Sequence, residues 1–161
     1  MAETDPLQQA VPFIDKLSED ARIIVTEGVR KVSVEGGKGI LQPGDRVDGA
    51  YFVRKGSIRV FYLDEEGREG TLYTIGRGQS CVLALNCLFA EMEYPAWAEA
   101  GEQGAEIYHL NGKAARRLMS QDPAFLSAIF AQVSSRLYGL LATLEQAIRL
   151  PLKGRLVALL L

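Results

Sequence analysis

The side chains best suited to chemistry are two cysteines and one histidine. Cys81, Cys87 and His109 are the only residues of these types among the 161 residues. Two thiols this close in sequence can form a disulfide or a sulfenic acid, so thiol oxidation is one candidate chemistry. Two cysteines are too few for a disulfide scaffold or a four-cysteine metal site, and one histidine is too few for a histidine cluster. We therefore expect no metal site.

No catalytic arrangement accompanies these residues. The sequence shows neither a Ser/His/Asp pattern nor a prominent pair of carboxylates, which favours a binding module over an enzyme. A hydrophobic content of 48% and a charged content of 24% are typical of a globular protein. The net charge of −2 gives no basic surface for nucleic acid. The acidic start has no signal-peptide core, and no apolar run is read as a membrane span, so we expect a cytoplasmic protein without a membrane partner.

Helices and then short strands must position these residues. Apolar residues recur at helical spacing through residues 6–27, and Gly28 ends that region. Alternating stretches separated by glycine turns follow, which is typical of a sandwich, barrel or roll. The predicted strands include residues 50–54, 57–63, 71–75, 94–100 and 105–110.

A long helix is predicted after the strands. Asn111 suits the N-cap of a short helix, and Asp122 with Pro123 suits the start of a long one that ends near Arg149. Its apolar residues step alternately by four and three, as in a coiled-coil seam. We predict that this seam forms a dimer interface: Leu126, Phe130, Val133, Leu137, Leu140 and Leu144.

A second apolar set lies beside the seam and is expected to pack on the roll: Phe125, Ile129, Leu141 and Ile148. The alternative is one wide stripe buried within a monomer. Leu150 and Pro151 are predicted to break the helix as a hinge. The apolar residues 156–161 would then either pack back or begin a further domain, and we favour the second interpretation.

The glycine-punctuated motifs resemble those of one known family. They are residues 39–45 (GILQPGD), 51–60 (YFVRKGSIRV) and 67–69 (GRE), followed by the Gly78 turn and the hinge at 150–156. In this order the chain resembles the Crp/Fnr family of bacterial transcription regulators over nearly its whole length.

The resemblance implies a mainly β fold with flanking helices. This fold is a double-stranded β-helix, or jelly roll, of the cyclic-nucleotide-binding kind, followed by a long C-terminal dimerisation helix. The sensor roll would span residues 1–121, the dimerisation helix 122–149, and the hinge and start of a winged helix-turn-helix domain 150–161. The chain would be a homodimer that meets DNA through a domain absent from these residues.

The family's phosphate cassette is degenerate in this chain. The resemblance places a Gly-Glu pair and a later Arg-Ser pair where this sequence has Val82-Leu83 and Glu93-Tyr94. No Arg or Lys occurs from Cys81 to Glu106, so a cyclic phosphate would meet carboxylates instead of a cation. We therefore predict that cyclic AMP and cyclic GMP do not bind through this cassette.

The effector and any cofactor stay unidentified at this stage. Candidate effector-binding residues lie in and around the degenerate cassette: Ser80, Cys81, Asn86, Cys87, Tyr94 and Trp97. The alternatives are thiol oxidation, haem ligated by Cys81, Cys87 or His109, and a small apolar metabolite stacked on Trp97. A stand-alone regulatory roll that acts on a partner protein is the competing function. The family's iron–sulfur branch is excluded because no cysteine precedes Cys81.

Overall fold

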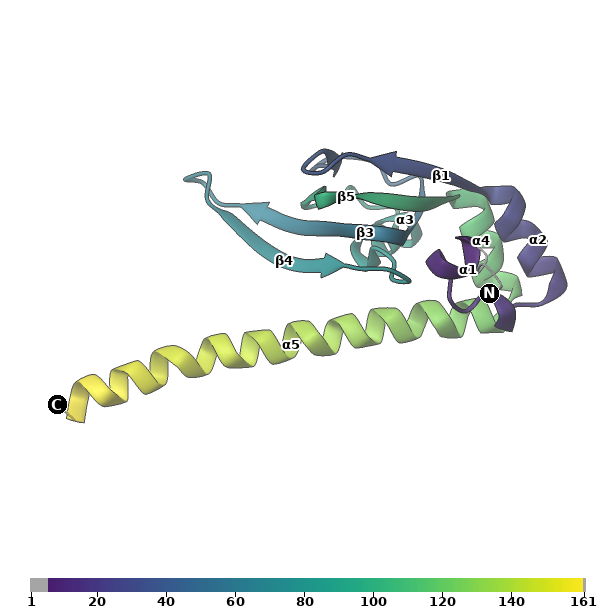
Figure 1. Cartoon of the computed structure of the whole chain (residues 1–161). Helices are drawn as coiled ribbons and strands as arrows, with labels where there is room; N and C mark the ends of the chain where they lie inside the picture. The colour runs from purple at the N-terminus through teal and green to yellow at the C-terminus, as the bar shows by residue number, and fades with distance from the viewer. Residues whose placement is uncertain (1–5, 161) are drawn as a thin grey trace, which may run out of the picture.

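The computed structural model describes residues 6–160, and the side chains of residues 6–149. An antiparallel roll lies above one long helix, and the short helices of residues 6–28 and 112–121 gather at one end (Figure 1). The strands are β1 (Val29–Val34), β2 (Gly39–Leu41), β3 (Gly49–Leu63), β4 (Glu69–Ile75) and β5 (Trp97–Asn111). The helices are α1 (Pro6–Ala10), the 3-10 helix η1 (Ile14–Lys16), α2 (Glu19–Gly28), α3 (Val82–Ala90), α4 (Gly112–Gln121) and α5 (Pro123–Leu160).

The sheet is antiparallel throughout, with strand order β1-β5-β3-β4 and β2 paired to β5. The predicted strands 50–54 and 57–63 form one strand, β3, and residues 97–111 likewise form one strand, β5. The pairing register of β3 with β5 shifts on both sides of Lys55-Gly56, where the sequence predicted a break. Gly56 has φ +74, and a Cβ there would lie 2.0 Å from the carbonyl oxygen of Gly104. Only glycine fits this close approach of the two strands, so the predicted break is a kink within continuous strands.

Two apolar clusters form the core. One fills the roll and includes Val53, Ile58 and Ile107, all nearly fully buried. The other joins the short helices to the end of the roll and to the start of α5. In this second cluster the Phe13 ring meets Phe125 edge-on, with 5.8 Å between centroids. The α5 helix is thus anchored at its beginning.

The start of α5 is capped as predicted. The Asp122 carboxylate accepts a hydrogen bond from the Phe125 N–H at 2.8 Å, and its other oxygen accepts from the Ser18 hydroxyl at 2.8 Å and the Ser18 N–H at 3.1 Å. The aspartate therefore caps α5 and ties it to the start of α2. Asn111 likewise caps α4 through the Ala114 N–H, as predicted.

The end of α5 differs from the prediction. The backbone stays helical past Arg149 and through Pro151 to Leu160. A proline inside a helix removes one backbone hydrogen bond and crowds the preceding turn, and a helix can continue beyond such a site. The predicted break is therefore not seen in the backbone. The side chains of the predicted hinge, Leu150 and Pro151, lie outside the described residues, and the hinge stays a prediction.

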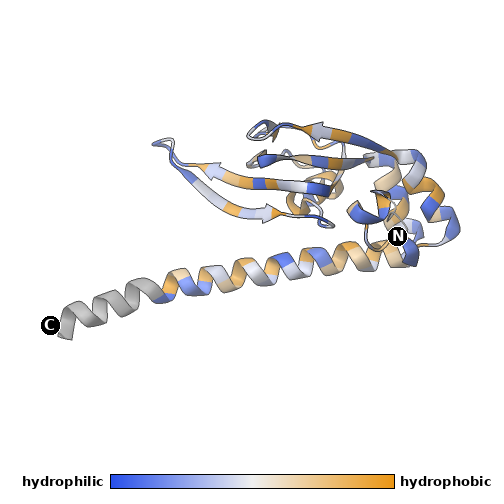
Figure 2. Cartoon of the chain, in the orientation of Figure 1, coloured by the Kyte–Doolittle hydropathy of each residue, from blue (hydrophilic) through white to orange (hydrophobic). Residues whose placement is uncertain are grey.

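The apolar residues of α5 divide between two environments. Phe125 and Ile129 are buried against the roll end, as predicted, whereas Leu141 and Ile148 of the same set are exposed. All six predicted seam residues are exposed, among them Phe130 at 69% and Leu137 at 57%. Figure 2 shows hydrophobic positions recurring along this helix among polar ones. An apolar face on the described part of α5 is thus left without a covering within one chain.

By length and composition alone, one helical stretch could cross a membrane. Residues Pro123–Arg149 contain a window of mean hydropathy 1.3, of which 11% is buried. The sequence expectation of no membrane-length apolar run does not hold by this criterion. The stretch includes Arg136, Glu145 and Arg149, which do not suit a bilayer interior.

Candidate functional site

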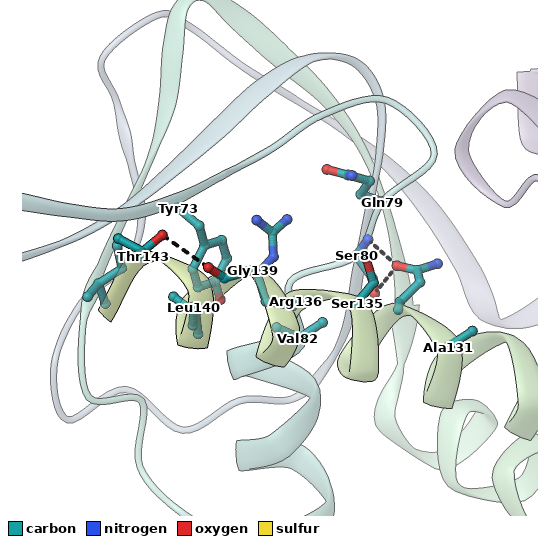
Figure 3. A pocket seen from close by; sticks show the side chains of 12 residues that line it. Tyr73, Gln79, Ser80, Val82, Ala131, Ser135, Arg136, Gly139, Leu140 and Thr143 are labelled. Carbon is teal, nitrogen blue, oxygen red and sulfur yellow. Dashed lines mark hydrogen bonds between the residues drawn. The ribbon is translucent and has the colours of Figure 1, made fainter. Parts of the chain in front are cut away.

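A cavity of about 510 Å³ lies between the roll and α5. β4 and the segment that leads into α3 form one wall, and α5 forms the other (Figure 3). Ligand cavities commonly measure roughly 300–1,000 Å³, so this one can hold a small molecule. It is lined by Leu72, Tyr73, Gln79, Ser80, Val82, Ala131, Gln132, Ser135, Arg136, Gly139, Leu140 and Thr143.

Ser80 and Gln132 join the two walls. The Ser80 backbone N–H and its hydroxyl both donate to Oε1 of Gln132, each at 2.8 Å. An isolated bridge between Phe52 and Ser80 holds the serine backbone against the roll, and Ser80 is 1% exposed. Two donors thus converge on one oxygen at the edge of the cavity (Figure 3).

Arg136 supplies the positive charge of the cavity. Its guanidinium lies 4.4 Å from the centroid of the Tyr73 ring, and Nη2 donates to the carbonyl of Thr74 at 3.3 Å. Within residues 6–149, Arg136 forms no ion pair with a carboxylate. The described residues that line the cavity include no Asp or Glu. The cavity therefore carries one uncompensated cation that the ring holds in place.

The lining residue Tyr73 belongs to a buried group of two phenols and one thiol. Sγ of Cys81 lies 4.0 Å from the Tyr73 hydroxyl oxygen and 3.6 Å from that of Tyr94. Burial raises the pKa of the Cys81 thiol above its ordinary value, against the opposing effect of nearby hydrogen bonds. Burial also raises the pKa of both tyrosines. These groups are neutral at physiological pH.

One of the six predicted effector residues lines the cavity. Ser80 lines the cavity, whereas Cys81 and Tyr94 lie buried behind its wall. Asn86 is exposed on α3.

Cys87 and Trp97 also lie outside the cavity lining. Cys87 is buried, and its thiol donates to the carbonyl of Glu93 at 3.5 Å. Trp97 stacks on Phe61 with 6.5 Å between ring centroids. The position of Trp97 fits the packing interpretation better than a ligand platform.

Sequence reasoning missed the contribution of α5 to the cavity. Gln132 and Arg136 lie four residues apart, so they share one face of the helix. They interrupt the apolar pattern of residues 125–144. That interruption was the available signal for a polar face turned toward the roll.

The segment where the resemblance places the phosphate cassette forms a helix. Val82 and Leu83 begin α3, which was not foreseen, and Glu91 and Glu93 are exposed beyond it. The described cavity draws its cation from α5 rather than from the roll segment where the resemblance places one.

The described residues place few side chains that could ligate haem iron or another metal ion. His109 is 5% exposed as a side chain and its Nε2 lies 2.9 Å from Oδ1 of Asp48. The described lining of the cavity contains no His, Cys or Met to ligate haem iron. Across the described residues, no group of three or more His, Cys, Asp or Glu side chains is placed to hold a metal ion.

Known proteins similar to this chain are regulators. Residues 31–122 match the family model described as the cyclic nucleotide-binding domain. The chain is 30% identical over 99 residues to the cAMP-activated global transcriptional regulator CRP of an Escherichia coli O6:H1 strain, covering 61% of this chain and 46% of that protein. The chain therefore spans about half the length of the curated relatives it matches first. These relatives are regulators rather than enzymes, in agreement with the prediction.

Solved structures share the fold. A Crp/Fnr-family regulator from Eubacterium rectale matches with a TM-score of 0.75 and 20% identity, over 85% of this chain and 63% of that one. The sensor domain of the regulator DNR from Pseudomonas aeruginosa matches with a TM-score of 0.66 and 20% identity, over 85% of this chain and 89% of that one. The jelly-roll prediction and the resemblance drawn from the roll motifs are both confirmed.

Proposed function

Because this chain belongs to the cyclic nucleotide-binding domain family, we propose that it is the sensor and dimerisation half of a dimeric bacterial transcription regulator. The observation that carries the proposal is the cavity of about 510 Å³ between the roll and α5. Its small-molecule effector binds there. A cytoplasmic location and a DNA-binding domain beyond these residues complete the proposal.

The α5 helix has the two faces that such a sensor requires. Gln132 and Arg136 face the cavity, whereas Leu137 and Leu144 are exposed and available to a partner helix. A ligand that moves the first face also moves the second, because both belong to one rigid helix. Effector binding would therefore reposition the two helices of the dimer and whatever follows them.

The effector is not a cyclic nucleotide held through the phosphate cassette. Val82 and Leu83 occupy the cassette position, and residues 81–106 contain no Arg or Lys to pair with a phosphate. The roll wall instead buries the neutral Tyr73, Cys81 and Tyr94. A cyclic phosphate would lose its charge-assisted hydrogen bonds to the roll.

Calorimetric titration of the chain with cyclic AMP and cyclic GMP tests the ligand part of this proposal. We expect no binding heat at micromolar concentrations of either nucleotide. A micromolar dissociation constant that survives Arg136→Gln would show a phosphate site on the roll and contradict the proposal.

The competing functions find less support in the geometry. The described cavity lining offers haem iron no His, Cys or Met ligand, and the raised pKa of Cys81 opposes reaction through a thiolate. A stand-alone roll that acts on a partner protein needs the same cavity but no further domain. The length of the natural gene separates the two, since a winged helix-turn-helix segment after residue 161 is expected only for the regulator.

A further inference from the structure

The cavity has a recognisable charge and hydrogen-bond pattern, and this inference rests on the proposed function. We propose that the effector is a small carboxylate with an apolar body. Its carboxylate replaces the Gln132 side chain on the two donors of Ser80, and Arg136 neutralises its charge. Gln132 is then a built-in plug whose displacement signals that the cavity is filled.

The Ser80 donors are already arranged for an oxygen ligand. Its N–H and hydroxyl both point at one Gln132 oxygen, at 2.8 Å each. A carboxylate oxygen accepts the same two bonds and, being charged, makes them about twice as strong as a neutral amide oxygen does. After this exchange both Ser80 donors still have an acceptor. Displacement of Gln132 therefore carries no free-energy penalty for a buried, unpaired donor at Ser80. The freed carboxamide can turn to water because α5 is exposed around it.

The charge of the cavity selects an anion. Arg136 lies about one helical turn beyond Gln132, so both side chains line the cavity from the same face of α5. It uses one nitrogen for the Thr74 carbonyl and holds its plane near Tyr73, and the structure describes no carboxylate paired with it. A guanidinium has five N–H donors, so donors remain for a ligand carboxylate. One cation with no acidic neighbour in the described lining matches one negative charge better than the multiple charges of a nucleotide.

The apolar residues of the lining favour a ligand whose remaining part, beyond the carboxylate, is apolar. Leu72, Val82 and Leu140 supply apolar surface from β4, from α3 and from α5 respectively. Burying that surface favours a hydrocarbon or aromatic group attached to the carboxylate. A volume of about 510 Å³ accommodates such a molecule.

The test compares phenylacetate with its neutral amide, phenylacetamide, by ¹H–¹⁵N NMR titration of the full chain. We expect phenylacetate to shift the Ser80 amide and the cavity-facing amides of α5, and to bind at least tenfold more tightly than phenylacetamide. Arg136→Gln should remove this preference, Arg136→Lys should keep most of it, and Gln132→Ala should tighten binding. Arg117→Gln is the matched control, because Arg117 lies on α4 and bonds Gln121 away from the cavity.

Results of the titration that differ from these expectations would overturn different parts of the proposal. Equal shifts from acid and amide, or a preference unaffected by Arg136→Gln, would overturn the carboxylate assignment but leave the cavity as a ligand site. Looser binding in Gln132→Ala would overturn the plug. If neither probe perturbs any cavity residue in a folded chain, the carboxylate proposal is overturned. If a cyclic nucleotide perturbs the roll of the same chain, the ligand part of the proposed function fails as well.

Discussion

At the residue scale, two of the hydrogen-bonded contacts between α5 and the rest of the chain have contrasting roles. Ser80 meets Gln132 at the cavity, and Ser18 meets Asp122 at the start of the helix. The first contact can be exchanged for a ligand oxygen. The second cannot, because Asp122 is 4% exposed and also caps the helix through Phe125. We expect the first contact to switch and the second to act as a fixed anchor.

The Asp122 anchor makes a stability prediction. Asp122→Ala should lower the free energy of unfolding by about 1–2 kcal/mol, because it removes the helix cap and leaves Ser18 without its acceptor. Asp122→Asn is the control that retains a capping oxygen and removes the charge. Urea unfolding followed by circular dichroism measures both. An alanine variant as stable as the wild type would contradict the role of the anchor.

The same residue predicts a pH dependence. Burial alone would raise the pKa of Asp122, but hydrogen bonds from Phe125 and Ser18 outweigh burial and hold the pKa below its ordinary value. A lowered native pKa stabilises the fold above the ordinary pKa, and this contribution disappears as the pH falls through the native value. The stability advantage of wild type over Asp122→Asn should therefore shrink below about pH 4. An advantage that grows on acidification would contradict this sign.

The buried thiol makes a reactivity prediction. Only thiolates alkylate readily, and burial raises the pKa of Cys81. Iodoacetamide at neutral pH should label Cys81 at least about tenfold more slowly in the native chain than in urea, as read by peptide mass spectrometry. Rapid native labelling of Cys81 would instead revive thiol oxidation as the signal.

At the element scale, the kinked strands shape the roll. A Cβ at Gly56 of β3 would lie 2.0 Å from the carbonyl oxygen of Gly104 in the paired strand β5. Gly56→Ala should destabilise the chain by more than the roughly 1–2 kcal/mol of left-handed backbone strain, because the new methyl group meets a carbonyl oxygen. Gly67→Ala is the matched control, since Gly67 has φ +80 and open space around it. If both variants lose the same amount of unfolding free energy in thermal or urea unfolding, then backbone strain alone explains the loss and the contact with Gly104 adds nothing.

The exposed seam of α5 predicts a dimer. Replacing Leu137 and Leu144 with Glu should place charges in the seam and yield monomers in sedimentation velocity. Tyr138→Glu is the control, because one residue further turns the side chain about 100° away from Leu137 around the helix. Persistent dimers in the double variant would contradict the seam assignment.

The sequence predicted the local signals of these elements better than their long-range partners. The caps at Asn111 and Asp122 and the turn glycines follow from local backbone chemistry, and the structure confirms both caps. Helix α3 was missed because its apolar run, Val82–Ala90, has almost no helical amphipathicity to mark it. The cavity was missed because its polar residues come from segments about fifty residues apart, and a single sequence does not show that they meet.

At the scale of the whole molecule, the proposed function makes α5 the element that would connect effector binding to dimer assembly. Its beginning is packed into the core, its middle lines the cavity, and further exposed apolar residues follow toward Arg149. Figure 1 shows the helix running along the roll. Under the proposed function, a ligand in the cavity and a partner helix at the seam would both act on α5, as coupling between two sites requires.

Native mass spectrometry of the chain purified under mild conditions tests this account most directly. The account predicts a particle of two chains that carries a small organic anion, and loss of that anion in Arg136→Gln while the dimer persists. A particle of one chain, or a dimer that retains a cyclic nucleotide in both wild type and Arg136→Gln, would contradict it.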